Sequence, residues 1–595
     1  MGQRAVEFAS AFAELESAGV LRGEAFAHDL VYSAVQRSVP PPIARHLHGA
    51  VAAHLGRHAG VAARVAAHWL AAEANREALP WLARAAQQAR TGFRRREELQ
   101  FLLTQARIEE SLGERAGAFD TLMRAHAAHF AVDPGDASIG PIFEALQRLA
   151  VTPEQRVDVD DMRATDFTNE GRHTDAEALA RRTLATARRL NYEKGCAALM
   201  STLSMSLSMQ GRLAEALAVL ERFWPYVERL PDPEPGYFND RAVVLDNLGR
   251  PREAIPLHRR TFELLLARAD SAEAVTSLGN LAVSLMECGR LRGAQRTLER
   301  AEALRRAHDE GDGVRATVML LALSVERALG RYDHALAWAD RAQKYLARSG
   351  SAYLPVADLG RSAIWTDLGQ LARALQALPE VGALSALPSA YMVARRWQFA
   401  ARLRVALGRN PLECAQAAAA ALGDENVLAV RESVTLQLAS LRGTASDLDA
   451  IFAVGAAARA DGRDGTALAA DLRAAELAAR LGMLHAAALH ADRARSVLSA
   501  DRDSDEAVTA TDLSDAEGWL MLGRTYAASG RAEDAADAYA RGAQWVVQAA
   551  SDHVAPEFRD SFLHRNPVHR DLLAAGAHEP SLAARLAALR TGVRE

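Results

Sequence analysis

The stretch WLMLGRTYAASGRAEDAADAY, residues 519–539, decides the fold of this 595-residue chain. Apolar residues recur three or four positions apart on both sides of Gly530, which predicts two amphipathic helices because the α-helix repeats every 3.6 residues. Gly530 lies between them, where a left-handed residue ends the first helix at little steric cost. The stretch therefore predicts one helical hairpin, and its defining positions are Trp519, Leu522, Gly523, Tyr526, Gly530, Ala535 and Tyr539.

The spacing from Gly530 to Ala535 recurs along the chain. A glycine followed five residues later by an alanine occurs at Gly171 and Ala176, Gly211 and Ala216, Gly249 and Ala254, Gly289 and Ala294, Gly330 and Ala335, and Gly369 and Ala374. These glycines follow one another in steps of 38–41 residues. We expect each alanine to lie where the second helix crosses the first closely. Because one hairpin buries only part of its apolar stripe, stacked hairpins are predicted to form a solenoid.

Residues 519–539 resemble the tetratricopeptide (TPR) consensus position for position, except that Val547 stands where the terminal proline is usual. The other units lack the tryptophan and repeat every ~40 residues instead of about 34, so they resemble a longer TPR variant. HEAT and armadillo repeats share the period of ~40 residues, but they do not explain the glycine-to-alanine spacing. The predicted fold class is all-α, an α-solenoid of tetratricopeptide-like hairpins that forms a right-handed superhelix.

The pattern divides the chain into three expected parts. Residues 1–90 form a helical, winged-helix-like module, residues 91–550 form the TPR-like solenoid of about ten hairpins, and residues 551–595 form C-terminal capping helices. Within the solenoid, residues 501–512 (DRDSDEAVTATD) are expected to be an acidic polar loop.

Composition excludes several classes of protein. About one residue in five is alanine, which favours helices that cross closely. The net charge of −5 argues against a dedicated nucleic-acid binder. The three cysteines are far apart, which excludes a disulfide framework and a zinc ribbon and favours a reducing compartment. The sequence shows neither a signal peptide nor an apolar stretch long enough to span a bilayer, so we expect a cytoplasmic protein.

Both ends of the chain resemble the large bacterial transcriptional activators that place a signal-transduction ATPase before a TPR region. Near the N-terminus the similarity covers about residues 8–90, and it rests on residues 12–35 with Arg45 and His48, including the phrase FAHDLV at residues 26–31. Near the C-terminus it rests on residues 558–573, FRDSFLHRNPVHRDLL. This tail is similar to that of activators with a bacterial transcriptional-activation domain (BTAD) or of the LuxR type. The resemblance implies a region that senses an effector or a partner protein.

The chain departs from those activators in two features. They need the phosphate-binding loop Gly-x-x-x-x-Gly-Lys-Ser/Thr, but Lys194 and Lys344 are the only lysines and neither follows a glycine. A C-terminal helix-turn-helix is also missing. We therefore expect a non-enzymatic TPR scaffold for protein interaction or effector sensing, which resembles the C-terminal regulatory half of a transcriptional regulator. The alternative is a part of an ATP-dependent regulatory system whose ATPase and DNA-binding domains lie on another or a truncated chain.

No residue pattern predicts a catalytic, cofactor-binding or metal site. His54 and His58 lie one helical turn apart, but a zinc site needs a third ligand. Cys196, Cys288 and Cys414 stand in apolar helical contexts and are expected to be packing residues. The expected ligand is a protein or peptide on the concave face, or a small effector. The arginine-rich helices, with Glu and Asp interleaved, indicate either solvated faces or a preference for acidic ligands.

Overall fold

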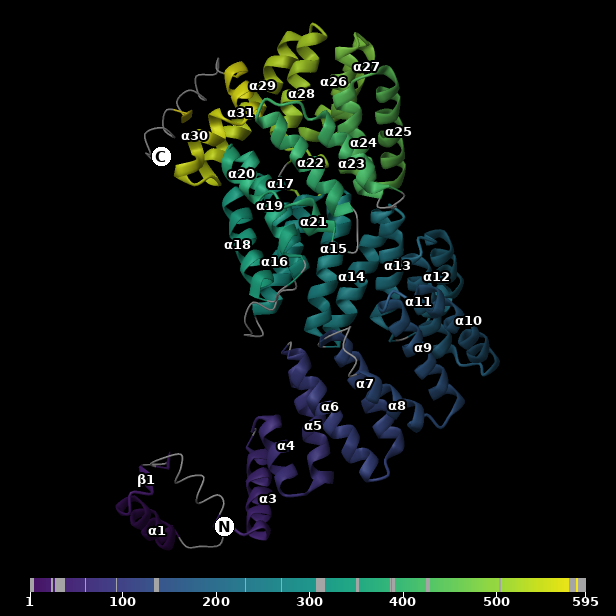
Figure 1. Ribbon diagram of the computed structural model, residues 1–595, viewed down its shortest axis with the longest axis vertical. Coiled ribbons are helices and arrows are strands. Elements are labelled where there is room, and N and C mark those ends of the chain that lie inside the picture. The colour runs from purple at the N-terminus through teal and green to yellow at the C-terminus, as the bar shows by residue number, and fades with distance from the viewer. Residues whose placement is uncertain are drawn as a thin grey trace. The chain divides into compact units, whose positions relative to one another are not determined.

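The protein is described by a computed structural model, in which the chain forms two compact units, residues 1–152 and 153–595. The described residues are 5–22, 25–26, 38–58, 60–92, 94–132, 139–230, 232–268, 270–306, 316–348, 351, 353–385, 387, 391–423, 428–501, 504–576 and 585–586. Helices make up nearly all of the regular structure in both units (Figure 1).

The elements of the first unit are α1 (Ala5–Ser17), β1 (Leu21–Arg22), β2 (Ala25–Phe26), α3 (Pro41–Arg57), α4 (Ala62–Ala71), α5 (Asn75–Thr91), α6 (Arg95–Ser111), α7 (Arg115–Val132) and α8 (Gly140–Leu149). β1 and β2 form a short antiparallel pair in which Leu21 lies opposite Phe26. Pro41 and Pro42 begin α3, where a proline costs no intrahelical hydrogen bond.

The second unit is a continuous series of helical hairpins. Its helices are α9 (Pro153–Asn169), α10 (His173–Arg189), α11 (Glu193–Met209), α12 (Leu213–Val227), α13 (Pro235–Asn247), α14 (Pro251–Ala267), α15 (Ser271–Glu287), α16 (Leu291–Arg306), α17 (Ala316–Ala328), α18 (Tyr332–Arg348), α19 (Leu354–Asp367), α20 (Leu371–Ala377), α21 (Val381–Ser385), α22 (Tyr391–Ala406), α23 (Leu412–Leu422), α24 (Leu428–Arg442), α25 (Ala445–Asp461), α26 (Asp464–Arg480), α27 (Leu484–Leu498), α28 (Asp515–Ala528), α29 (Ala532–Asp552), α30 (Pro556–His564) and α31 (Pro567–Ala575).

The turns within the hairpins share one geometry. The glycines at 171, 211, 249, 289, 330, 369 and 530 have φ between +70° and +78°, the left-handed region that favours glycine. At Gly211, the amide of the next residue, Arg212, donates to the carbonyl of Leu207 at 2.9 Å, and Gly211 itself donates to Ser208 at 2.9 Å. This pair of hydrogen bonds satisfies carbonyls that the end of an α-helix would otherwise leave unpaired.

The alanines of the repeated phrase lie at the crossings of the paired helices. Ala176, Ala216, Ala254, Ala294, Ala335 and Ala374 are fully buried, and Ala535 is nearly so. Helices that are adjacent in the chain pack against each other throughout the second unit. The prediction of an all-α solenoid of helical hairpins is therefore confirmed.

The second unit also folds back on itself, so that hairpins far apart in the chain touch. Arg252 of α14 pairs with Asp464 of α26 at 2.7 Å across 212 residues of sequence. Ser561 of α30 donates to the carbonyl of Leu368 at 2.7 Å, and Asn566 donates to the carbonyl of Asp367 at 2.9 Å. Figure 1 shows α30 and α31 beside α18–α20. The C-terminal helices thus close onto earlier hairpins.

Residues 504–514, which connect α27 to α28, lie between those earlier and later hairpins. The amide of Thr509 donates to the carbonyl of Gly289 at 2.8 Å, and that of Thr511 donates to the carbonyl of Gly465 at 3.0 Å. Ala507, Thr509, Ala510 and Leu513 are buried. A stretch expected to be an acidic polar loop thus has a buried second half that joins the α15–α16 turn to the start of α26.

Candidate functional site

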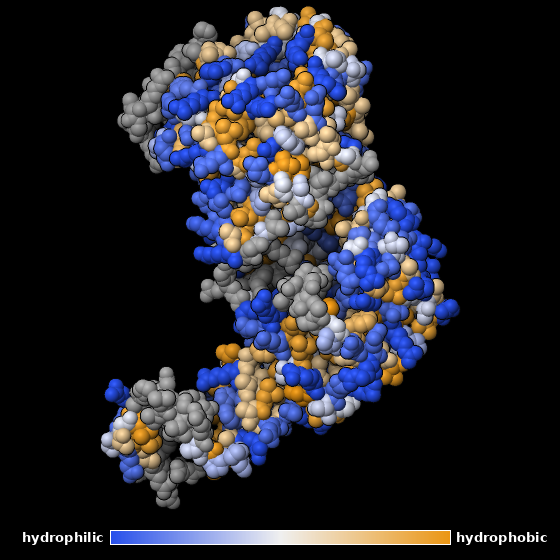
Figure 2. Space-filling view, in the orientation of Figure 1, coloured by the Kyte–Doolittle hydropathy of each residue, from blue (hydrophilic) through white to orange (hydrophobic). Residues whose placement is uncertain are grey.

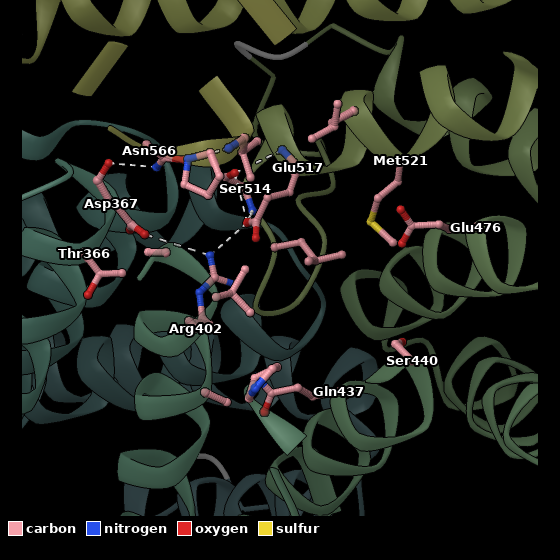
Figure 3. A pocket seen from close by; sticks show the side chains of 18 of the residues that line it. Thr366, Asp367, Arg402, Gln437, Ser440, Glu476, Ser514, Glu517, Met521 and Asn566 are labelled. Atoms are coloured by element: carbon pink, nitrogen blue, oxygen red, sulfur yellow. Dashed lines mark hydrogen bonds and ion pairs between the residues drawn. The ribbon is translucent and has the colours of Figure 1, made fainter. Parts of the chain in front are cut away.

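The inner helices of the closing hairpins surround a cavity of about 500 Å³. Its walls come mainly from α19, α22, α24, α26 and α28, the first helices of five successive hairpins, and from α31 (Figure 3). The volume falls within the range typical of small-molecule sites. Because every wall belongs to a different hairpin, the cavity exists only when the solenoid has closed.

One wall of the cavity is a network of arginines and carboxylates. Arg402 of α22 lies 2.9 Å from Glu517 and 3.9 Å from Asp367, and its guanidinium also donates to the carbonyl of Asp512 at 2.7 Å (Figure 3). Asp367 pairs in addition with Arg327 at 2.7 Å. Burial opposes the ionisation of Glu517, but Arg402 and Ser514 outweigh it, so the pKa of Glu517 is lowered. The network joins four segments of chain.

Asp512 extends this network behind the cavity. It accepts from Arg395 at 2.7 Å and from the hydroxyl of Ser433. Burial disfavours its charge, but Arg395, Ser433 and Arg402 more than compensate and hold its pKa at about 2. Asp512 also has φ +58°, an uncommon conformation for a residue other than glycine. The buried half of 504–514 is thus fixed to α22 and α24 by charge.

The cavity also contains an arginine without a carboxylate partner. Arg473 of α26 donates from Nη1 to Ser440 Oγ at 3.3 Å, and no carboxylate of the described residues lies within ion-pair distance of it. Its Nε is buried and has no hydrogen-bond partner, and Oε1 of the neighbouring Gln437 is likewise buried and unpaired. Burial lowers the pKa of Arg473, since nearby acids only partly offset the lost hydration.

Between its charged groups, which also include Glu476, Arg480 and Arg524, the surface of the cavity is apolar or neutral. Leu441, Leu520, Met521 and Val568 line it between the charged groups. His569 is buried and donates from Nδ1 to the carbonyl of Phe562 at 2.8 Å, and burial lowers its pKa to about 4. The histidine is therefore neutral near pH 7. The cavity combines an apolar body with charged groups, of which Arg473 has no carboxylate partner among the described residues.

The residues that define the repeat in the sequence form the frame of this site. Trp519, Leu522 and Tyr526 of α28 are buried in the packing between hairpins, and Tyr526 donates to Asp492 at 2.9 Å. Gly523 leaves room for the ring of Tyr539, which a Cβ would strike. The cavity instead receives Glu517, Leu520, Met521 and Arg524, which follow the i, i+3, i+4, i+7 spacing of one helix face.

The repeat pattern does not single out these cavity residues, because they lie between the positions that define the repeat. A second stripe of helical spacing on the first helix of each hairpin was the available signal. Arg402 and Arg473 belong to that stripe, yet a sequence does not show which arginine has a carboxylate beside it, because the partners come from other hairpins.

The histidine and cysteine candidates lie elsewhere. The rings of His54 and His58 are 4.5 Å apart at the end of α3, and Nδ1 of His48 lies 2.8 Å from Nδ1 of His68. Within the described ranges, no group of three or more His, Cys, Asp or Glu side chains has the arrangement of a metal site. Cys196, Cys288 and Cys414 are buried free thiols, and burial raises the pKa of each, that of Cys288 to about 12.

The segments that carry the resemblance to bacterial activators are only partly described. Most of the phrase FAHDLV, residues 27–31, lies outside the described residues. The C-terminal phrase forms α30 and α31, where Phe562 packs edge-on against Tyr332 at 5.4 Å and Phe558 against Trp365 at 5.2 Å. This phrase therefore fastens the C-terminal helices to α18 and α19 and contributes Asn566, Pro567 and Val568 to the cavity.

On the outer surface, the arginines are mostly paired with acids of the same or the next hairpin. Arg212, for example, lies 2.8 Å from Glu177 and 2.6 Å from Glu215. Figure 2 shows hydrophilic residues interspersed with hydrophobic ones over the face that it draws. None of the helices within the described ranges combines the length and the apolar character needed to cross a membrane.

Known proteins similar to this chain are found among solved structures only. No protein-family model matches it, and no curated protein matches it significantly. Among solved structures, it is similar to a tetratricopeptide repeat protein from Parabacteroides merdae, with 17% identity over 47% of this chain and 99% of that chain and a TM-score of 0.35. It is also similar to a Rap protein complexed with competence and sporulation factor (14% identity, 67% and 100% coverage, TM-score 0.40). A third similar structure is the apo quorum sensor NprR from B. thuringiensis (15% identity, 57% and 95% coverage, TM-score 0.42).

Likeness at this level says nothing about a ligand or partner. The TPR-like helical repeat is shown by the hairpins themselves.

Proposed function

We propose that this chain is a non-enzymatic TPR-like receptor and interaction scaffold whose ligand or partner segment enters the cavity between α19 and α31. The observation that carries the proposal is the cavity itself, which is lined by the inner helices of five hairpins and has a mixed apolar and charged surface. Solenoids bind with the surface that their inner helices present. In this unit, residues 504–514 already fill the space between α15 and α26. The inner helices remain accessible at the cavity, and the ligand therefore binds there.

We further infer that the receptor is the regulatory half of a bacterial transcriptional regulator and resides in the cytoplasm. This finer assignment rests on the resemblance of residues 8–90 and 558–573 to such activators. The C-terminal phrase supports it, because the same residues that carry the resemblance hold the cavity closed. A ligand in the cavity would thus touch the segment that links the sensing hairpins to the end of the chain.

A site-specific crosslink tests the proposed binding surface. A photoreactive phenylalanine analogue replaces Val405, which lines the cavity and is 49% exposed, or Leu489, which lies on α27 away from the cavity and is 52% exposed. In extract of the source organism, the Val405 variant is expected to capture one discrete partner, and unmodified chain should compete for it. Capture of the same set of proteins at both positions, or of none at either, contradicts the proposal.

Calorimetric titration with ATP tests the non-enzymatic assignment. Because the sequence has no phosphate-binding loop, we expect no binding of ATP in the presence of Mg²⁺. Tight, Mg²⁺-dependent binding would show a nucleotide site and would overturn the assignment.

A further inference from the structure

We infer that the cavity is a receptor site for a small amphipathic anion, whose acidic head pairs with Arg473 and whose apolar body lies against Leu441, Leu520 and Met521. This inference deepens the proposed function, since it names the class of ligand that the same cavity takes. It rests on the charge balance of the walls, on the unpaired atoms of Arg473 and on the volume enclosed.

The carboxylates that line the cavity already have arginine partners. Asp367 lies 2.7 Å from Arg327, Glu517 lies 2.9 Å from Arg402, and Glu476 lies 3.5 Å from Arg524. Arg473 has no such partner among the described residues and makes one hydrogen bond, to a neutral hydroxyl. Burying a guanidinium without a counter-ion costs free energy, because the group loses its hydration. An anion that pairs with Arg473 is therefore bound more strongly than by an arginine in water.

The free groups of Arg473 suit an oxyanion. Guanidinium presents parallel N–H donors that bind a carboxylate or phosphate in a two-point fashion. Within the described residues, Nη1 of Arg473 makes a single hydrogen bond, to Ser440, and Nη2 makes none, so Nη2 is the donor that an oxyanion in the cavity meets without breaking an existing bond, while the unpaired Nε stays buried. Ser440 Oγ accepts from Nη1 of this guanidinium at 3.3 Å and donates its own hydrogen to the carbonyl of Leu436 at 2.7 Å, so Ser440 orients Arg473 and does not itself bind the head group.

The size and lining of the cavity define the rest of the ligand. A volume of about 500 Å³ accommodates a small molecule, while a folded domain is excluded. The side chains of α24 and α28 next to the charged walls are leucine and methionine, which bind aliphatic or aromatic groups and exclude water. The class that fits is therefore one acidic head, either carboxylate or phosphate, on an apolar body.

The test uses the full chain and four probes that share an eight-carbon body: octanoate, octyl phosphate, octylamine and octanol. Titration calorimetry is expected to show saturable binding of one acidic probe per chain, at least tenfold tighter than that of octylamine or octanol. The ratio of octanoate to octyl phosphate affinity identifies the preferred head group. Equal affinity for octanoate, octyl phosphate and octanol would overturn the inference, because the arginine would then contribute nothing.

Arg473→Gln removes the charge, and Arg409→Gln serves as the matched control because Arg409 is an exposed arginine in the α22–α23 turn. We expect Arg473→Gln to weaken the acidic probes at least tenfold and to leave octanol binding unchanged, while Arg409→Gln changes neither. The Tm of the free Arg473→Gln chain should stay equal or rise, since a buried unpaired charge is lost. Wild-type affinity of Arg473→Gln for the acidic probes would refute the inference.

A lower Tm with no change in probe affinity would assign Arg473 a structural role and would likewise refute the inference. The outcomes separate this inference from the proposed function. If the Val405 variant captures a discrete partner but the chain shows no selectivity for acidic probes, the proposed function stands and the anion site is refuted. If acidic probes bind selectively through Arg473 but no protein is captured at Val405, the anion site stands and the macromolecular partner is refuted.

Discussion

Two groups of turns in the second unit have the same sequence phrase and the same backbone, yet they lie in different surroundings. At Gly171 and Gly211, a Cβ added to the glycine would meet no atom within 4 Å. At Gly289, it would lie 2.7 Å from the Cα of Gly465 and 2.8 Å from the carbonyl oxygen of Thr509. The turn at Gly249 is covered by Leu428 and Arg463, and the turns at Gly330 and Gly369 are covered by Trp545 and Ser561, respectively.

The difference shows that one motif has two physical roles. In the open turns, the glycine only ends a helix in a left-handed conformation. In the covered turns, the missing side chain also lets a later part of the chain approach the backbone, and this approach closes the solenoid around the cavity. The stability of the covered turns therefore includes contacts that span about 200 residues, whereas that of the open turns is local.

The largest effect is expected at Arg463, which fastens the covered turn of Gly249. Its side chain is 2% exposed, pairs with Glu432, lies 2.7 Å from Asp461 and donates to the carbonyl of Gly249 at 3.2 Å. Arg463→Met leaves Glu432 buried without its partner, so the free energy of unfolding should fall by about 3–5 kcal/mol. Urea denaturation measures the loss, and the double variant Arg463→Met/Glu432→Gln should recover part of it.

Arg250→Met is the control for Arg463, because Arg250 follows the same glycine but pairs with Glu253 at the surface. An exposed pair of this kind contributes at most about 1 kcal/mol. Similar losses for the two variants would show that closure at Gly249 contributes no special stability.

The next effect compares one open and one covered glycine directly. Gly211→Ala and Gly289→Ala place the same methyl group at φ +76° and +75°. The left-handed conformation costs alanine roughly 1–2 kcal/mol at both positions. At Gly289, the contact with the backbone of Gly465 should add about 1–3 kcal/mol, as overpacking does in a core.

Hydrogen exchange of residues 504–514 resolves the two glycine variants. Protection there should be lost in Gly289→Ala and retained in Gly211→Ala. Equal unfolding free energies for the two variants, with exchange at residues 504–514 unchanged in both, would mean that the covered turn accommodates the methyl group. Covered and open turns would then not differ in their contribution to stability.

The sequence predicted the glycine-ended helices that the open and the covered turns share. It did not predict which turns are covered by later parts of the chain. Glycine, alanine and the apolar stripe are local signals with a period, so the hairpins and their stacking followed from Gly171 to Gly530. The contacts that close the solenoid leave no periodic signal in the sequence, because residues such as Arg252 and Asp464 are far apart in the chain and become neighbours only in the folded protein. The cavity residues Arg402 and Arg473 were missed for the same reason, since their significance depends on partners from other hairpins.

A smaller effect is expected from pH, and it also distinguishes two regions. Asp161 on α9 and Asp240 on α13 are hydrogen-bonded by Thr202 and Ser201, yet burial raises their pKa values to about 7 and about 6. A carboxyl whose pKa is raised on folding contributes stability that is complete below its unfolded pKa and is lost as pH rises to the folded value. Protection of α9 and α13 from exchange, corrected for intrinsic rates, should therefore fall from pH 4 to pH 7.

The wall of the cavity should not follow this trend. The pKa of Asp512 is held at about 2, so its contribution is present above about pH 4 and is lost only in stronger acid. Asp161→Asn should flatten the pH profile of α9, and Asp160→Asn, a change at an exposed neighbour, should leave it intact. An unchanged profile in Asp161→Asn would exclude Asp161 as its source.

The smallest effect concerns a turn of the first unit that has the left-handed geometry without the glycine. Glu73, between α4 and α5, has φ +58°, and the amide of Ala74 donates to the carbonyl of Trp69 at 3.0 Å, the same bond that follows the glycines of the second unit. A side chain in this conformation costs roughly 1–2 kcal/mol, whereas glycine costs about 0.4–1 kcal/mol through the unfolded chain. Glu73→Gly should therefore stabilise the first unit by about 0.5–1 kcal/mol, less a small loss from the exposed pair with Arg45. Thermal unfolding of residues 1–152 within the full chain, followed by exchange of α4 and α5, measures the gain, and a decrease would mean that the ion pair outweighs the backbone.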